Sequence, residues 1–144
     1  MNPNSCCKGA AFLRISVGAL MLFGHGLPKL QNFSAIAGQF PDPLGVGSAT
    51  SLGLTVFAEF FCSLLIILGI GTRLAALPLM ITMGVAFFVI HAADPFSTKE
   101  LALFYLLAFS AIFISGTGQY PVAKNVLPKT NNKTLNCLFE RDFD

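Results

Sequence analysis

Formal charge is scarce in this sequence. Its 144 residues include nine Lys or Arg and seven Asp or Glu, so 11% are charged, whereas soluble domains average about 25%. The net charge of +2 is too small for a phosphate-tracking surface, which excludes a nucleic-acid binder. A disordered chain is excluded as well, because 54% of the residues are hydrophobic and fifteen are Phe.

Several cofactor motifs are also missing. The four cysteines form no CxxC motif and no zinc-type spacing, so they predict no metal site and say nothing about disulfides. The sequence has no GxGxxG motif and no iron–sulfur cysteine pattern. No cofactor is therefore evident from the sequence, and any part in oxidoreduction would need a partner or a bound ligand.

Long stretches without charge are what the sequence does contain. Twenty uncharged residues separate Arg73 from Asp94, and 23 separate Glu100 from Lys124. A membrane-spanning helix needs about 20 mostly apolar residues. Two further stretches are long enough to cross the membrane if each tolerates one ionisable residue. The first contains Arg14 and the second contains Glu59.

We predict an all-α fold, an integral membrane bundle of four transmembrane helices. The predicted spans are roughly 10–30, 50–71, 74–93 and 100–118. Gly26 and Pro28 are expected to close the first, Gly69 and Gly71 the second, and Pro78 falls in about the first turn of the third. We predict that residues 1–122 form the bundle and that residues 123–144 form a polar cytoplasmic tail.

Basic residues predict the orientation of the bundle. Lys8, Arg14, Arg73 and the lysines of the tail fall on one side, whereas only Lys29 and Lys99 fall on the other. Because basic loops stay inside, both termini are predicted to be cytoplasmic. The alternative is a cleaved signal peptide over residues 1–26, but Arg14 interrupts its apolar run.

Four polar side chains are predicted to share one depth in the bundle. At about 1.5 Å per residue, His25, Glu59, His91 and Tyr105 lie about 18–25 Å from the cytoplasmic helix ends. Each comes from a different span. Ionisable groups inside a membrane are costly, so this layer is a candidate functional site.

The chemistry of this layer suits a ligand with a polar head. Imidazole, carboxylate and phenol together can bind the carbonyls of a quinone, or hold another polar head group. His25 is the expected partner of Glu59, since Arg14 lies about 12 Å lower. Lys29, four residues after His25, is placed nearer the outer mouth, where it could steer an anion.

Structural roles remain open for each of these residues. Glu59 could be a purely interhelical hydrogen-bonding group, and His25 and His91 could cap helices or meet water. Tyr105 could belong to the interfacial aromatic belt, and Arg14 could be an anchor that extends to the membrane surface. A haem between His25 and His91, or a two-histidine, one-carboxylate metal site, is conceivable but not favoured, because histidines alone specify no cofactor.

The same residues resemble a known family. Similarity to the DoxX family of small four-span membrane proteins rests on Arg14, Gly18, His25–Leu30, Glu59, Leu68–Arg73, His91, Glu100–Leu101 and Gly116–Tyr120. It covers roughly residues 10–122. The family pattern often continues with Ser-Leu-Asp, whereas this chain continues with Pro121–Ala123, so no role of that aspartate carries over.

The resemblance implies a multi-pass protein of the bacterial inner membrane. It implies an accessory or subunit of a quinone-linked redox or oxidative and thiol-stress system, with a redox partner subunit or a second copy as possible partners besides the lipid bilayer. Arg14 and Glu100 are secondary site candidates. The alternative is a non-enzymatic membrane binding, transport or assembly protein with a structural Glu/His cluster, and whether the chain is catalytic stays open.

Overall fold

The structure, a computed structural model, describes residues 3–116, and every regular element in this range is helical. Four stretches of the described residues are long and apolar enough to cross a membrane: Lys8–Gln31, Ser48–Leu68, Thr72–Ile90 and Phe96–Ser115. The prediction of an all-α fold with four spans is confirmed. The predicted polar tail lies outside the described residues.

The first span ends at Gln31, next to its predicted end at residue 30. It comprises α1 (Pro3–Met21), the π-helical segment η1 (Leu22–Gly26) and α2 (Leu27–Gln31), and the short α3 (Phe33–Ile36) follows. Gly26 and Pro28 do not terminate it. Gly26 and Leu27 both keep helical backbone angles, so the helix passes from the π-helical segment through Pro28 and carries Lys29.

The second and third spans are joined by a tight turn at residues 69–71, not at Thr72 and Arg73, the two residues between the predicted spans, which lie in the third helix. The second comprises α4 (Ser48–Val56), η2 (Phe57–Cys62) and α5 (Ser63–Leu68), and the third comprises α6 (Thr72–Val85) and η3 (Ala86–Ile90). Gly69 and Gly71 adopt φ of 72° and 55°, left-handed conformations that favour glycine. Pro78 lies in the interior of α6, later than expected.

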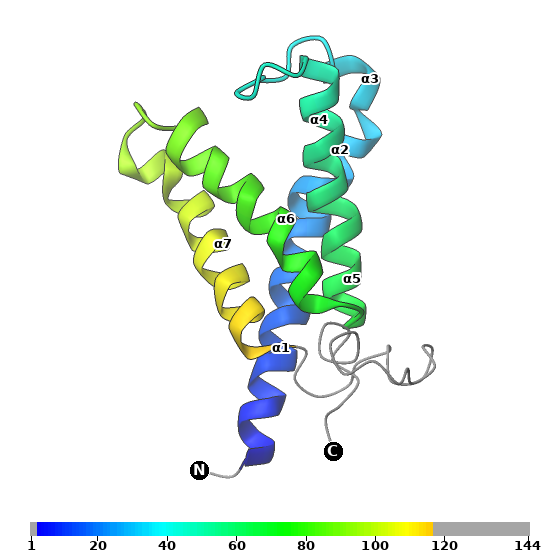
Figure 1. The fold of residues 1–144 in the computed structure, drawn as a ribbon, viewed down its shortest axis with the longest axis vertical. Coiled ribbons are helices and arrows are strands. Elements are labelled where there is room, and N and C mark those ends of the chain that lie inside the picture. Colours follow the sequence, from blue (N-terminus) through cyan, green and yellow to red (C-terminus); the bar gives the residue numbers. More distant parts are fainter. Residues whose placement is uncertain (1–2, 117–144) are drawn as a thin grey trace.

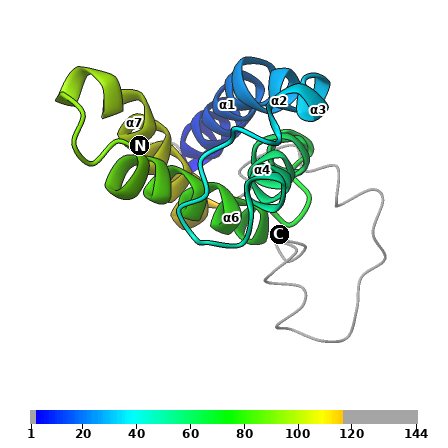
Figure 2. The same ribbon diagram turned by 90° about the horizontal axis from the view of Figure 1, so that it is seen from above.

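The fourth span, α7 (Phe96–Ser115), pairs with α6. Figures 1 and 2 show α6 running along α7, while α1 packs against α5 and α7. In Figure 1 the N-terminus and the turn between α5 and α6 lie at the lower end, and segments 37–47 and 91–95 lie at the upper end. α4 and α6 separate towards that upper end.

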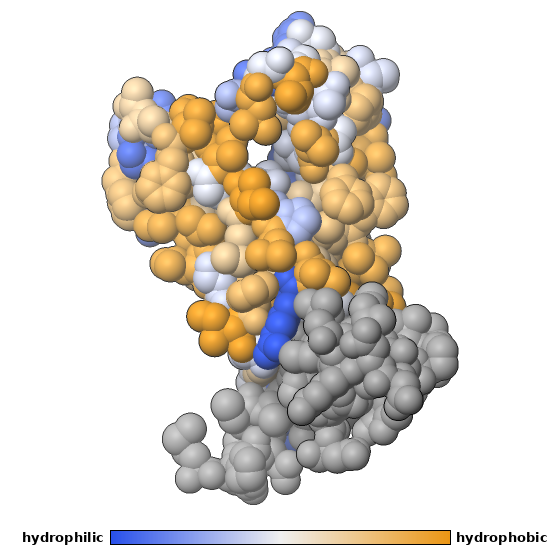
Figure 3. All heavy atoms as spheres, viewed as in Figure 1, coloured by the Kyte–Doolittle hydropathy of each residue, from blue (hydrophilic) through white to orange (hydrophobic). Residues whose placement is uncertain are grey.

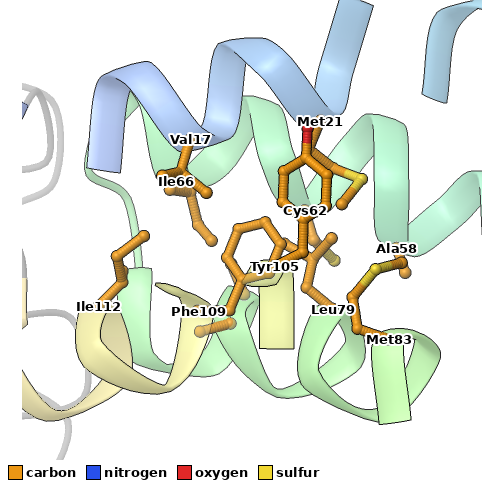
Figure 4. Packing of buried hydrophobic residues seen from close by; sticks show 12 residues of the cluster. Val17, Met21, Ala58, Cys62, Ile66, Leu79, Met83, Tyr105, Phe109 and Ile112 are labelled. Carbon is orange, nitrogen blue, oxygen red and sulfur yellow. The ribbon is translucent and has the colours of Figure 1, made fainter. Parts of the chain in front are cut away.

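A compact core holds the spans together at the level of the polar residues. Figure 4 shows Tyr105 and Phe109 of α7 packed among side chains of the other three spans. The buried cluster includes Val17, Met21, Ala58, Cys62, Ile66, Leu79, Met83, Tyr105, Phe109 and Ile112.

Large apolar side chains cover much of the outer surface, as the orange areas of Figure 3 show. The most exposed include Phe12, Ile81, Phe88 and Ile114, each at least 66% accessible. Such a surface suits contact with lipid tails rather than water. The chain is therefore a multi-pass membrane protein.

Candidate functional site

The carboxylate of Glu59 forms an ion pair with Lys29. Glu59 comes from η2 and its side chain is 3% exposed, whereas Lys29 comes from α2 and is 25% exposed. The Lys29 ammonium donates a hydrogen bond to Oε2 of Glu59. His25 was the expected partner. Lys29 takes that place because helical side chains lean towards the helix N-terminus, which directs a long lysine back from the upper end towards the bundle interior.

A glycine allows the two chain segments to meet at this point. A Cβ on Gly26 would lie 2.5 Å from the Glu59 carbonyl oxygen and 2.8 Å from the Phe60 nitrogen. Only a residue without a side chain fits such a contact. The backbones of η1 and η2 therefore touch immediately below the ion pair.

Three of the four spans contain a π-helical segment. Segment η1 carries His25, η2 carries Glu59, and η3 ends directly before His91. A π turn widens the helix by one residue and occurs frequently at functional sites. The polar layer predicted from depth arithmetic thus coincides with the irregular part of each of these helices.

Tyr105 and His25 contact one another within that layer. Their ring centroids are 5.5 Å apart in an edge-to-face arrangement, and Tyr105 also stacks on Phe109 at 6.0 Å. Tyr105 is only 6% exposed, so it is a core residue and not part of an aromatic belt at the surface. Neither ring lies in the wall of the cavity that Glu59 lines.

That cavity has a volume of about 590 Å³ and lies between the second and third spans. Its walls come from α4 and η2 on one side and from α6 and η3 on the other. Figure 3 shows the surface hollowed between the upper parts of these helices. Most lining groups are apolar, and the polar ones are Lys29, Ser51, Thr55, Glu59, Thr82 and His91.

His91 reaches the cavity from the upper end of the third span. Its Nδ1 lies 2.7 Å from Oδ2 of Asp94, and both side chains are partly exposed. A carboxylate on one ring nitrogen fixes the orientation of an imidazole and leaves Nε2 for other partners. Sequence reasoning missed Asp94, although its spacing of three residues after His91 was a usable signal.

A short segment covers the upper mouth of the cavity. Phe40, Pro41, Pro43 and Leu44 all line it, and we call residues 40–44 the cover segment. Asp42 fastens this segment to the start of α4. Its carboxylate accepts hydrogen bonds from the Val46 amide (3.1 Å), the Gly47 amide (2.7 Å) and the Ser51 hydroxyl (2.7 Å).

These bonds act on the charge state of Asp42. The Ser51 hydroxyl, and after it the Gly47 amide, lowers the pKa of the Asp42 carboxyl below its ordinary value, because both bonds favour the ionised form. Sequence reasoning assigned no role to this segment, which falls between the predicted first and second spans. Asp42 followed by Pro43, Gly45 and Gly47 is a turn signal that could have revealed it.

The two secondary candidates lie elsewhere. Arg14 is 1% exposed and does not extend to the surface. Its Nη1 donates to the carbonyl oxygens of Ile66 (2.8 Å) and Ile67 (2.9 Å) at the C-terminal end of α5, where Ile66 also accepts from the Gly69 amide (3.0 Å). Glu100 is exposed and lies in a shallow depression with Ser97 and Phe104.

The structure thus divides the predicted layer into two groups. Lys29, Glu59 and His91 line one cavity, while His25 and Tyr105 pair in the neighbouring core. Among residues 3–116, no three His, Cys, Asp or Glu side chains are grouped as metal ligands. This arrangement can hold a polar head group at the ion pair and an apolar chain along the cavity wall.

Comparison with known proteins agrees with the fold. The DoxX family model matches residues 9–92, which contain most of the first span and all of the next two. An uncharacterized protein of Haemophilus influenzae is 36% identical over 119 residues, covering 75% of this chain and 83% of that protein. No solved structure matches the chain. On the family model and this relative, the chain belongs to the DoxX family.

Proposed function

We propose that this DoxX protein binds a quinone in the cavity between its second and third spans, as an accessory or subunit of a quinone-linked redox or stress-response system. The observation that carries the proposal is a buried ion pair, Lys29–Glu59, in the wall of a largely apolar cavity of about 590 Å³. Ligand sites in proteins have this volume and this mixture of many apolar groups with a few polar ones.

The polar groups match both redox states of a quinone. The carbonyl oxygens of the oxidised form accept hydrogen bonds, which the Lys29 ammonium can donate. The hydroxyls of the reduced form also donate, and both the Glu59 carboxylate and Nε2 of His91, whose Nδ1 faces Asp94, can accept. A site with both kinds of group can therefore hold the ligand before and after reduction.

Electrons must come from outside this chain in this proposal. The sequence carries no flavin, nicotinamide or iron–sulfur pattern. We therefore propose a redox partner subunit in the same membrane, which for a family of this kind is the bacterial inner membrane. The DoxX chain would contribute the quinone site.

Equilibrium binding tests the quinone site. The full chain is placed in phosphatidylcholine nanodiscs under anaerobic conditions, and the affinity for the reduced, hydroquinone form of a benzoquinone with a decyl chain is measured. Glu59→Gln and His91→Ala should each weaken binding by about 10-fold or more, the value of one hydrogen bond to a charged group. Unchanged affinity in both variants overturns the proposal.

Glu100→Gln is the matched control for this experiment. It makes the same chemical change as Glu59→Gln at an exposed position away from the cavity. Its quinone affinity should equal that of the wild-type chain. If Glu100→Gln lost as much quinone affinity as Glu59→Gln, removal of any negative charge would explain the effect, and the cavity site would be rejected.

A further inference from the structure

We infer that the cavity takes its ligand from the bilayer and selects an amphiphile with an uncharged head group, and that the Lys29–Glu59 pair makes this selection. This inference rests on the cavity being a ligand site, as proposed above, but not on the ligand being a quinone. It concerns the chemical class of ligand and the residues that distinguish one class from another.

The wall of the cavity reaches the lipid-facing surface. Leu54 and Phe57 on the second span and Ile81 on the third line the cavity and are also 53%, 52% and 66% exposed. Because both helices are membrane spans, this exposed wall faces hydrocarbon. The cover segment, in contrast, places Phe40, Pro41 and Leu44 across the upper mouth. The open side for an apolar chain is therefore the gap between α4 and α6.

The hydroxyl groups of the wall are already engaged. Thr55 donates to the Ser51 carbonyl oxygen (2.9 Å), Thr82 to the Pro78 carbonyl oxygen (2.9 Å), and Ser51 to Asp42 (2.7 Å). Their hydrogens thus face partners in the protein. Recognition of a head group is left to Lys29, Glu59 and His91.

The ion pair makes the polar part of the cavity neutral. A phosphate or carboxylate head would gain Lys29 but would meet the carboxylate of Glu59, and a cationic head would meet Lys29 in the same way. In an apolar surrounding these like-charge contacts are weakly screened. An uncharged head that both donates and accepts can bind each partner without separating the pair.

Charges near His91 do not alter this balance. The carboxylate that faces His91 is Asp94, which lies 2.7 Å from Nδ1 and does not line the cavity. Lys99 lies on α7 and contacts the Ala92 carbonyl oxygen and the ring of Phe87. Across the cavity, the charged groups are the paired Lys29 and Glu59. The site thus fits a quinone, a prenol or a diacylglycerol rather than a phospholipid or a fatty acid.

A charge-switch experiment tests this inference on the full chain in phosphatidylcholine nanodiscs. The probes are decyl-benzoquinone and farnesol as neutral amphiphiles, oleate as an anion and dodecylamine as a cation. The wild-type chain should bind at least one neutral probe and neither charged one. Glu59→Gln leaves Lys29 without its partner, so its affinity for oleate should rise about 10- to 100-fold, whereas Glu100→Gln should stay like wild type.

The opposite substitution gives a second, independent outcome. Lys29→Gln leaves the carboxylate, and its affinity for dodecylamine should rise by the same factor. If Glu59→Gln fails to fold, as far-UV circular dichroism would show, this variant still tests the inference. Two results would overturn the inference. One is that the wild-type chain binds oleate as tightly as the neutral probes, and the other is that a folded variant shows no rise in affinity for its charged probe.

Access from the bilayer is tested separately. Ala86 lines the cavity on η3, and Ala86→Phe should weaken binding of decyl-benzoquinone but not of the same ring without a chain. Ala35→Phe, at an exposed position of α3 outside the cavity wall, is the control. If Ala86→Phe weakened the binding of both ligands equally, the decyl chain would not lie in the gap between α4 and α6.

The outcomes separate this inference from the quinone proposal. Farnesol binding with a charge switch, but without any quinone binding, rejects the quinone and retains the selection rule. Quinone binding that depends on Glu59 without any charge switch rejects the selection rule and retains the quinone site.

Discussion

Glu59 illustrates how one charged residue is accommodated in an apolar bundle. A buried carboxylate without a partner is very costly, and insertion into the membrane centre alone costs about 2.5–3.5 kcal/mol for a charged residue. Lys29 offsets this cost by direct pairing. Because such a pair rarely stabilises more than well-packed apolar groups would, its presence favours a role in ligand binding.

The residues of this site were only partly predictable. Glu59 and His91 stood out because ionisable groups are rare in spans, and both line the cavity. The partner of Glu59 did not follow from Cα depth, since the lysine side chain reaches about one helical turn back from its own position. His25 shares the depth of Glu59 but lies against Tyr105, because rotation about the helix axis depends on packing.

Asp42 gives a pH-dependent prediction at the scale of one residue. Its folded pKa is lowered, chiefly by the Ser51 hydroxyl and then by the Gly47 amide. A lowered folded pKa means that the stabilisation of the cover segment is complete above the ordinary pKa of Asp and is lost as pH falls through the folded pKa. Below about pH 4 we therefore expect faster hydrogen exchange in residues 40–47, after correction for the intrinsic rate.

Two variants identify the group responsible. Asp42→Asn should exchange faster at neutral pH and lose the acid-dependent step, because it has no titrating carboxylate. Asp94→Asn alters a different carboxylate of the upper end and should keep that step. An unchanged acid-dependent step in Asp42→Asn would show that another group loosens the segment.

At the scale of helices, close contact between the first two spans positions the site. Segment η2 lies directly against η1 at Gly26, and the Lys29–Glu59 ion pair joins the same two spans one turn higher. Neighbouring glycines of the first span differ sharply in surroundings. A Cβ on Gly24 would meet nothing within 4 Å, whereas one on Gly26 would overlap the backbone of Glu59.

This contrast predicts opposite effects of two similar substitutions. Gly26→Ala should destabilise the protein by about 1–3 kcal/mol or more, because a backbone carbonyl cannot move aside as a side chain can. Gly24→Ala should be neutral or stabilising by up to about 1 kcal/mol, since alanine favours the helix. The measurement is unfolding in detergent followed by far-UV circular dichroism, and similar stability of the two variants would contradict the close contact.

Helix ends show what local sequence signals can and cannot predict. Gly69 and Gly71 were expected to end the second span and do so, because their left-handed backbone is a local requirement. Pro28 was expected to end the first span and does not, because the helix continues from the π-helical segment η1 into α2. The π segments could not be predicted, because they depend on contacts between spans rather than on the residues within one.

At the scale of the whole molecule, the cavity arises from unequal packing of the spans. α6 lies along α7, and α5 meets α6 near the lower end, while α4 and α6 separate above (Figure 1). Apolar patterning predicts four spans but not their crossing angles, which follow from how side chains interlock. The fold class was thus predictable from composition, whereas a cavity between two particular spans was not.

The ends of the bundle differ in charge, and this predicts its orientation. Of the elements towards the lower end in Figure 1, α1 carries Lys8 and Arg14, and α6 begins with Thr72 and Arg73. The elements towards the upper end are α2 with Lys29, segments 37–47 and 91–95 with Asp42 and Asp94, and the start of α7 with Lys99 and Glu100. Because lysine and arginine are retained on the cytoplasmic side, the lower end should face the cytoplasm and the cover segment the opposite side. With four spans, this orientation predicts that both termini are cytoplasmic.

Reporter fusions in a bacterial host measure this orientation directly. Green fluorescent protein joined to the C-terminus should fluoresce, and alkaline phosphatase inserted after Gly38 should be active, because each reporter works on one side of the membrane. An active phosphatase at the C-terminus would reverse the assignment. A variant with Arg73→Glu and three lysines added after Gly38 should give a mixed or inverted population, since it removes the charge bias that sets the orientation.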